Sequence, residues 1–208
     1  RRHSPAYARI LEKLHFTGPS ATIEDLPYLP VSLFKSHLLT SVPESSVRNV
    51  LTSSGTTGQQ LSKITVDATT ADRQARGLAN SIQSVLGPKR LPMILVDTPS
   101  LLKDPSLMSA RGAGVLGMMR FGHDHFFALD DHMRLNMSGL RSFCEKHADT
   151  PFAIFGFTFM VWKYLIGSIE QTGDRPDLSN GILIHSGGWK KLADEAVDNA
   201  TFKSRTTA

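Results

Sequence analysis

The segment Leu91-Pro92-Met93-Ile94-Leu95-Val96-Asp97 is the strongest indication of fold class in the chain. Leu91–Val96 is a continuous apolar run, which is typical of a strand buried on both faces. Further strands and helices alternate after it. We expect strands at His125–Leu129, Phe152–Phe155 and Gly181–His185, and helices at Ser106–Met119, Asp130–His147, Thr158–Ile169 and Trp189–Asn199. These four strand-then-helix units predict an α/β fold with a mostly parallel sheet flanked by helices, which binds ligands at the carboxyl ends of its strands.

Before this segment, residues 1–50 are expected to form an extended arm, because Pro27 and Pro30 force extended geometry on the residues that precede them. A short helix at Ala6–Leu14 and one or two helical turns at Val31–Leu39 interrupt the arm. The α/β domain would then occupy residues 51–208. It would begin with a strand–loop–strand unit and a helix that Thr69 or Thr70 caps and that ends near Leu86.

The composition excludes several classes of protein. With 208 residues, 40% apolar residues and a net charge of +4, the chain is too apolar and too weakly charged to be disordered. Its one cysteine cannot form an internal disulfide, which favours a reducing cytoplasm. No apolar run is long enough to span a membrane. The basic residues do not cluster, so we expect no nucleic-acid partner.

The loop Thr52-Ser53-Ser54-Gly55-Thr56-Thr57-Gly58 holds five hydroxyl groups and two glycines, and Lys63 follows five residues later. Glycines allow several backbone N–H groups to point at one anion, and the hydroxyls and the lysine add donors. The loop lacks the Walker sequence of nucleoside triphosphatases. Composition alone leaves two interpretations open, a phosphate-binding loop or a solvated Ser/Thr turn.

Three segments of the chain resemble a known family. The Thr52–Gly58 loop with Lys63 resembles the phosphate-binding loop of the adenylate-forming superfamily, which includes acyl-CoA synthetases. The segment Asp25-Leu26-Pro27-Tyr28-Leu29-Pro30-Val31-Ser32-Leu33-Phe34-Lys35, the loop itself and Ser186-Gly187-Gly188-Trp189-Lys190-Lys191 resemble the LuxE-type acyl-protein synthetases. The chain therefore looks like the N-terminal part of an adenylate-forming enzyme.

The resemblance implies that ATP and Mg²⁺ activate a fatty acid, or another small carboxylic acid, as an acyl-adenylate whose acyl group then passes to a protein thiol. An acyl reductase or another acyl acceptor protein would be the partner. The phosphates of ATP would be bound by Ser53, Ser54, Gly55, Thr56, Thr57, Gly58 and Lys63. The adenine would lie against Ser186, Gly187, Gly188 and Trp189. The alternative for Trp189 is core packing at a plain strand-to-helix turn.

Two other functions remain open on the sequence: an aryl- or acyl-CoA ligase of the phenylacetate type, and a nucleotide-binding module without catalysis. The family's members are longer than 208 residues. We therefore expect the domain to be incomplete at its C-terminal end, the catalytic residues to lie outside this chain, and the chain alone to be inactive.

Three further residue groups can be given candidate roles. Gly114, Met118, Phe155 and Phe157 could line an acyl pocket, although core packing explains them equally well. Cys144 lies on the apolar face of an expected helix, which favours a buried structural thiol over a nucleophile. His123 and His125 could share one face of a strand, but no further ligand cluster accompanies them, so we expect no metal site.

Overall fold

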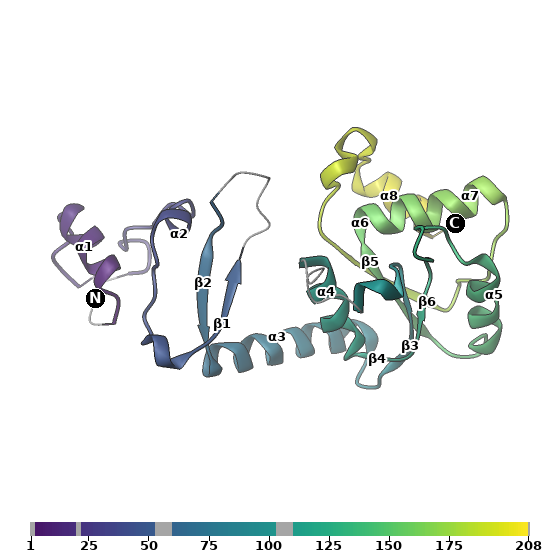
Figure 1. Cartoon of the computed structure of the whole chain (residues 1–208), viewed down its shortest axis with the longest axis horizontal. Helices are drawn as coiled ribbons and strands as arrows, with labels where there is room; N and C mark the ends of the chain where they lie inside the picture. Colours follow the sequence, from purple (N-terminus) through teal and green to yellow (C-terminus); the bar gives the residue numbers. More distant parts are fainter. Residues whose placement is uncertain (1–2, 20–21, 53–59, 103–109, 208) are drawn as a thin grey trace. The chain divides into compact units, whose positions relative to one another are not determined.

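The computed structural model describes residues 3–19, 22–52, 60–102 and 110–207. Figure 1 shows the order of the elements along the chain. The chain divides into two compact units, residues 1–80 and 81–208, each with its own internal packing. The arm predicted for residues 1–50 lies within the first unit. None of the helices in the described ranges is both long and apolar enough to cross a membrane.

The first unit contains the short helices α1 (Pro5–Lys13) and α2 (Leu33–Ser36), and the hairpin of β1 (Val47–Thr52) and β2 (Lys63–Asp67). The two strands are antiparallel, and Thr52 pairs with Lys63. Both predicted strands are therefore confirmed, and α2 corresponds to the one or two helical turns predicted at Val31–Leu39. A 3₁₀ turn, Glu44–Ser46, precedes the hairpin.

Helix α3 (Ala68–Leu86) follows the hairpin and ends at Leu86, as predicted. The expected cap was wrong, however. Oδ1 of Asp67 accepts a hydrogen bond of 2.8 Å from the backbone N–H of Thr70, so Asp67 rather than a threonine caps the helix. Asp67 both ends strand β2 and caps the helix, which starts without an intervening loop.

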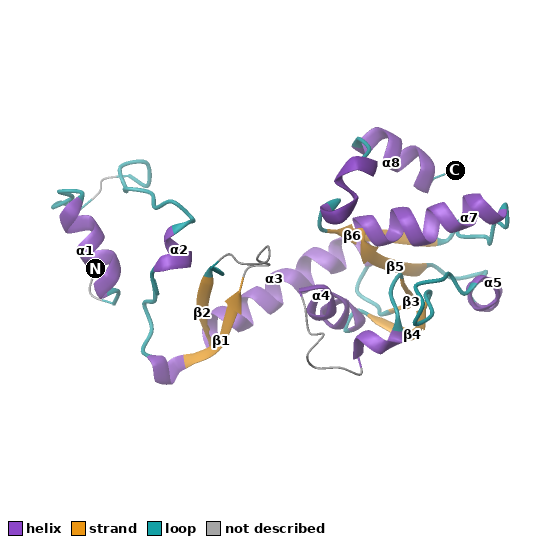
Figure 2. Ribbon diagram, turned by 45° about the horizontal axis from the view of Figure 1, so that its top comes forward, coloured by secondary structure: helices purple, strands orange, loops and turns teal. Residues whose placement is uncertain are grey.

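The second unit is built on a four-stranded parallel sheet of β4 (Gly122–Phe127), β3 (Leu91–Leu95), β5 (Phe152–Phe157) and β6 (Gly181–Ser186), in that order (Figure 2). All three pairings between neighbouring strands are parallel. The predicted α/β fold with a mostly parallel sheet is therefore confirmed. The antiparallel hairpin of the first unit forms a separate sheet.

Successive residues of the central strands alternate between two hydrophobic clusters, one on each face of the sheet. Ile94 and Ile154 belong to one cluster, together with side chains of α5 (Met137–Lys146), the Thr158–Thr172 helix and α8 (Asn199–Thr206). Leu95 and Phe155 belong to the other, together with side chains of α3 and α4 (Ala110–Met119). Because both faces are covered by helices, the central strands can be apolar throughout.

The helix expected at Asp130–His147 begins only at Met137. Oδ1 of Asp130 accepts hydrogen bonds from the backbone N–H groups of His132 and Arg134, which stabilises a turn instead of a helix. Asn136 then caps α5 by accepting from the N–H of Gly139 at 3.0 Å. The local polar side chains thus outweigh the helical spacing of the apolar residues before Met137.

Two further predicted helices, at Thr158–Ile169 and Trp189–Asn199, differ in their details. The helix at Thr158–Ile169 is present, but it runs to Thr172 and contains a π-helical segment, Val161–Ile166, between α6 (Thr158–Met160) and α7 (Gly167–Thr172). The prediction of one helix at Trp189–Asn199 is wrong. A 3₁₀ segment, Lys190–Glu195, is followed by a break, and α8 starts at Asn199 after its cap Asp198.

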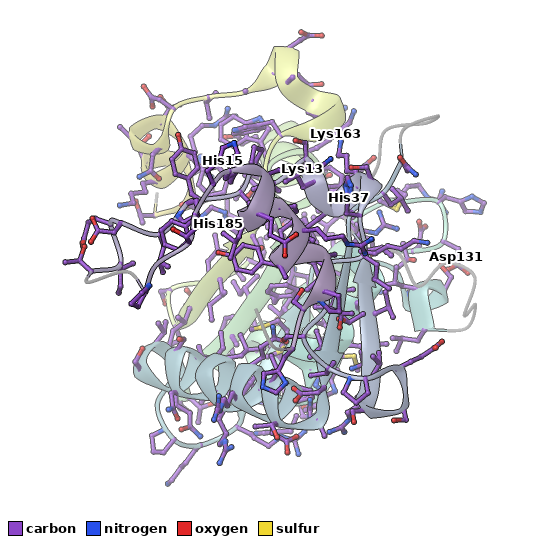
Figure 3. All side chains as sticks on the ribbon, turned by 90° about the vertical axis from the view of Figure 1, so that its left-hand side faces the viewer. Lys13, His15, His37, Asp131, Lys163 and His185 are labelled. Atoms are coloured by element: carbon purple, nitrogen blue, oxygen red, sulfur yellow. The ribbon has the colours of Figure 1, made fainter. Side chains whose placement is uncertain are left out.

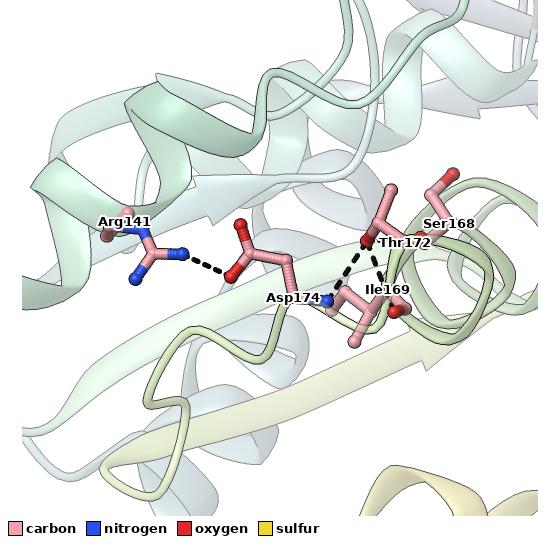
Figure 4. A network of polar contacts seen from close by, with 5 residues as sticks. All are labelled: Arg141, Ser168, Ile169, Thr172 and Asp174. Carbon is pink, nitrogen blue, oxygen red and sulfur yellow. Dashed lines mark hydrogen bonds and ion pairs between the residues drawn. The ribbon is translucent and has the colours of Figure 1, made fainter.

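The end of α7 is tied to α5 by polar contacts (Figure 4). The hydroxyl of Thr172 donates to the carbonyls of Ser168 (2.9 Å) and Ile169 (3.2 Å) and accepts from the N–H of Asp174 (3.3 Å). Gly173, between them, adopts the left-handed conformation with φ +70°. The carboxylate of Asp174 pairs with Arg141 on α5. These contacts turn the chain back toward β6.

We expect Gly156→Ala to lower the free energy of unfolding by about 1–3 kcal/mol, because the added methyl group overpacks the interior. A Cβ at Gly156 would lie 2.8 Å from Cγ2 of Val161 and 2.9 Å from Cβ of Val96. Urea unfolding followed by circular dichroism measures the change. Gly117→Ala is the matched control, because a Cβ added there would meet no packing neighbour within 4 Å among the described residues. Equal stabilities of the two variants would contradict the prediction.

Candidate functional site

The carboxyl ends of β5 and β6 lie next to each other and carry the segment predicted to contact adenine. Phe157 pairs with Ser186 in the last register position of the two strands. Gly187 follows with φ +78°, a left-handed conformation that favours glycine. A Cβ at Gly187 would also lie 2.9 Å from Cδ1 of Phe157. The chain therefore turns here in a way that only glycine accommodates without strain.

The side chain of Thr158 holds this turn. Thr158 is buried and follows β5 directly. Its Oγ1 lies 3.2 Å from the carbonyl oxygen of Ser186, 3.0 Å from that of Gly187 and 3.0 Å from Nδ1 of His185. One hydroxyl group thus connects the start of the α6 helix with the last two residues of β6 and with the turn that follows.

His185, labelled in Figure 3, is the penultimate residue of β6. Its ring packs at 4.6 Å, centroid to centroid, against Phe202 of α8. Partial burial of the imidazole lowers the pKa of His185 from its ordinary value, because desolvation disfavours the charged form. The neutral imidazole is therefore the favoured state at neutral pH. The sequence alone gives Thr158 and His185 no role, although Thr158 begins a predicted helix and His185 ends a predicted strand.

Of the four residues predicted to contact adenine, Trp189 differs from the other three. Its indole is half-buried and packs edge-on against Trp162 at 5.5 Å and against Phe202 at 6.3 Å. The packing role that the sequence left open for Trp189 is therefore present. Ser186, Gly187 and Gly188 are exposed, and their contact with adenine stays a prediction.

The predicted phosphate-binding residues Ser53, Ser54, Gly55, Thr56, Thr57 and Gly58 lie outside the described residues. The residues that bound this loop are described: Thr52 ends β1, Lys63 begins β2, and the two are paired. Lys63 is exposed. The two strands that flank the predicted loop are therefore present, and phosphate binding stays a prediction.

The predicted acyl-pocket residues all lie in the second unit. Met118 and Phe155 are buried in the same hydrophobic cluster. Phe157 is buried in the opposite cluster, and a Cβ at Gly114 would lie 3.1 Å from its ring. Gly114 and Phe157 thus approach each other closely. Core packing accounts for these positions, and the acyl pocket stays a prediction.

A buried carboxylate lies at the carboxyl end of β3. The Oδ1 atom of Asp97 accepts a hydrogen bond of 2.8 Å from the N–H of Thr98. Oδ2 lies 3.4 Å from Nε of Arg111 on α4, and among the described residues it has no hydrogen-bond donor. Desolvation raises the pKa of Asp97, and the bond from Thr98 and the charge of Arg111 offset this only in part. The sequence placed Asp97 at the end of a strand but did not identify this pair.

The two histidines of β4 are not arranged as the sequence predicts. Asp124, with φ +47°, is the extra residue of a bulge in β4, so His123 and His125 occupy successive pairing positions opposite β3 rather than one face. Nε2 of His125 lies 3.0 Å from the carbonyl oxygen of Met119. Within the described ranges, no group of three or more His, Cys, Asp or Glu side chains could hold a metal ion.

We expect Asp97→Asn to stabilise the second unit more at pH 7 than at pH 4. The raised pKa means that the folded state holds the Asp97 proton more tightly than the unfolded state, so wild-type stability falls as pH rises from 3.8 through the raised value. The asparagine side chain of the variant has no proton to lose, so the variant avoids this loss of stability. Its amide oxygen can still accept the hydrogen bond from the N–H of Thr98. Urea unfolding of both proteins at several pH values tests the difference. A constant difference across this range would contradict the prediction.

We expect Cys144 to react very slowly with thiol reagents in the folded protein. Cys144 is buried on α5, as predicted, and desolvation raises the pKa of its thiol to about 11, with smaller contributions from Asp177 and Glu145. At pH 8 about one thiol in a thousand is then ionised. Because the chain has one cysteine, colour release from an aromatic disulfide reagent reports this site alone. Rapid stoichiometric labelling without denaturant would contradict the assignment.

Comparisons with known proteins support the resemblance of the three sequence segments. A search of the curated proteins gives no match. The family model described as "Acyl-protein synthetase, LuxE" matches residues 6–207, which is nearly the whole chain and includes both units. The match covers the hairpin with its hydroxyl-rich loop as well as the glycine turn after β6. The chain therefore belongs to the LuxE acyl-protein synthetase family.

Proposed function

We propose that this chain is the ATP-binding part of an enzyme that activates a fatty acid as its adenylate and transfers the acyl group to a protein thiol. The observation that carries the proposal is the match of the acyl-protein synthetase family over residues 6–207. The sequence of the Thr52–Gly58 loop and the glycine turn at Gly187 support it, because each has the chemistry that one end of ATP requires.

The loop would bind the β- and γ-phosphates. Its backbone N–H groups and hydroxyls are neutral donors suited to oxyanions, and Lys63 adds a positive charge at the start of β2. Mg²⁺ would enter with the phosphates of ATP and help neutralise the charge that grows on the departing pyrophosphate. The carboxylate oxygen of the acid would attack the α-phosphorus, and the bond from that phosphorus to the bridging oxygen would break.

The turn at residues 186–188 would receive the adenine. Gly187 and Gly188 have no side chains, so a flat ring can approach the backbone closely. Thr158 fixes the carbonyl oxygens of Ser186 and Gly187 from the buried side, which leaves the exposed side of the turn for a ligand. The turn also lies at the carboxyl end of a parallel sheet, where ligands of such folds bind.

Carboxylate-dependent exchange of pyrophosphate into ATP, measured with the full-length protein and without coenzyme A, tests the first half-reaction. We expect exchange with long-chain fatty acids. Exchange with aryl acids alone would move the assignment to a CoA ligase of the phenylacetate type. A folded protein that binds ATP but supports no exchange with any acid would favour the non-catalytic nucleotide-binding module.

We expect Gly187→Ala to reduce this exchange at least tenfold. The new methyl group would lie 2.9 Å from the Phe157 ring on a residue with φ +78°, so the turn must change shape. Gly173→Ala is the control: its φ of +70° is similar, a Cβ added there would meet no packing neighbour within 4 Å among the described residues, and it has no role in the proposed site. Both variants lose about 1 kcal/mol or more of stability from strain. Equal exchange rates for the two would contradict a role for the turn.

A further inference from the structure

The hydroxyl of Thr158 has one hydrogen and three close polar neighbours. Two of them, the carbonyl oxygens of Ser186 and Gly187, can only accept, at 3.2 and 3.0 Å. If the hydrogen pointed elsewhere, the hydroxyl oxygen would face two carbonyl oxygens with no proton between them, which is repulsive. The hydrogen of Thr158 is therefore directed to the turn and is shared between the two carbonyls.

The third neighbour must then be the donor. Nδ1 of His185 lies 3.0 Å from Oγ1 of Thr158, whose lone pairs remain available. A neutral imidazole carries one N–H group, so a proton on Nδ1 leaves Nε2 as an acceptor. Desolvation lowers the pKa of His185 and thereby favours this neutral form.

The position of Nε2 is defined as well. The ring plane is held between the bond to Thr158 at one end and the packing against Phe202 at 4.6 Å. Within the described part of the chain, no residue forms a hydrogen bond with Nε2, and His185 is exposed. His185 directly precedes the Ser186–Gly187 segment. The residue that precedes the glycine turn thus carries an acceptor nitrogen whose ring is held in place.

We propose that Nε2 of His185 accepts a hydrogen bond from the 6-amino group of the adenine bound at this turn, and that Thr158 is the positioning residue that presents this lone pair. The inference rests on the proposed function, because it requires a nucleotide at the turn. It assigns base specificity to a side chain, whereas the glycines provide space for the ring.

The test compares ATP with purine riboside triphosphate, which is ATP without its 6-amino group. Titration calorimetry with the full chain and Mg²⁺ gives both dissociation constants. We expect the wild type to bind ATP about fivefold to tenfold more tightly, the value of one hydrogen bond. The readout is the ratio of the two dissociation constants, since a general loss of stability would weaken the binding of both ligands alike.

Matched variants separate the role of the hydroxyl from its packing. Thr158→Val keeps the shape of the side chain but removes the hydroxyl, so the ratio should fall toward one. Thr158→Ser keeps the hydroxyl and should restore the preference for ATP. His185→Phe keeps an aromatic ring against Phe202 without the nitrogen and should also bring the ratio to one.

A second measurement needs no ligand. Nitrogen-15 shifts of the His185 ring at pH 8 should show the proton on Nδ1 in the wild type and in Thr158→Ser, and a shift toward the Nε2–H form in Thr158→Val. An Nε2–H form in the wild type, a wild-type ratio near one, or a ratio that Thr158→Val leaves unchanged would overturn the inference. Binding of neither nucleotide would instead refute the proposed function on which it rests.

Discussion

The second unit depends on the burial of strand β5 on both faces and at both edges. All six residues from Phe152 to Phe157 are buried, and the strand pairs with β3 on one side and β6 on the other. A strand in this position satisfies its backbone groups only through its neighbours, so the parallel register is fixed along its length. Both hydrophobic clusters draw side chains from this strand, and every helix of the unit that packs on the sheet covers one of them.

This register also determines what meets at the carboxyl edge of the sheet. Asp97, Thr158 and the Ser186–Gly187 segment stand at the carboxyl ends of three adjacent strands, β3, β5 and β6. Two of them carry a local cost, namely a buried carboxylate with a raised pKa at Asp97 and a hydroxyl shared among three partners at Thr158. At the third, Gly187 has a left-handed backbone that favours glycine. Such departures from ordinary packing concentrate at functional sites. At this edge they occur where an α/β sheet binds its ligands.

The sequence was informative where one physical effect dominates. The strands at residues 91–96, 152–155 and 181–185 are predictable because two-sided burial requires continuous apolar runs. The prediction of helix starts from the sequence is wrong where short polar side chains compete with the helical spacing of apolar residues, as at Asp130 and Asn136. It is also wrong at Asp67, which ends a strand and caps a helix at once. The contact of Thr158 with His185 could not be predicted, because it depends on β5 and β6 being neighbours, and 27 residues of sequence separate the two side chains.

The packing of Trp189 has an optical consequence. The chain contains two tryptophans, and their rings lie 5.5 Å apart at an angle of 83°, one on the π-helical segment and the other directly after the glycine turn. Two indoles this close and this steeply inclined couple their electronic transitions, which produces a paired positive and negative band in the ultraviolet dichroism spectrum. The guanidinium of Arg205 lies 4.4 Å from the Trp162 ring and adds a charge next to this pair. The protein thus carries an intrinsic chromophore whose signal depends on the geometry at the end of β6, and it needs no added label.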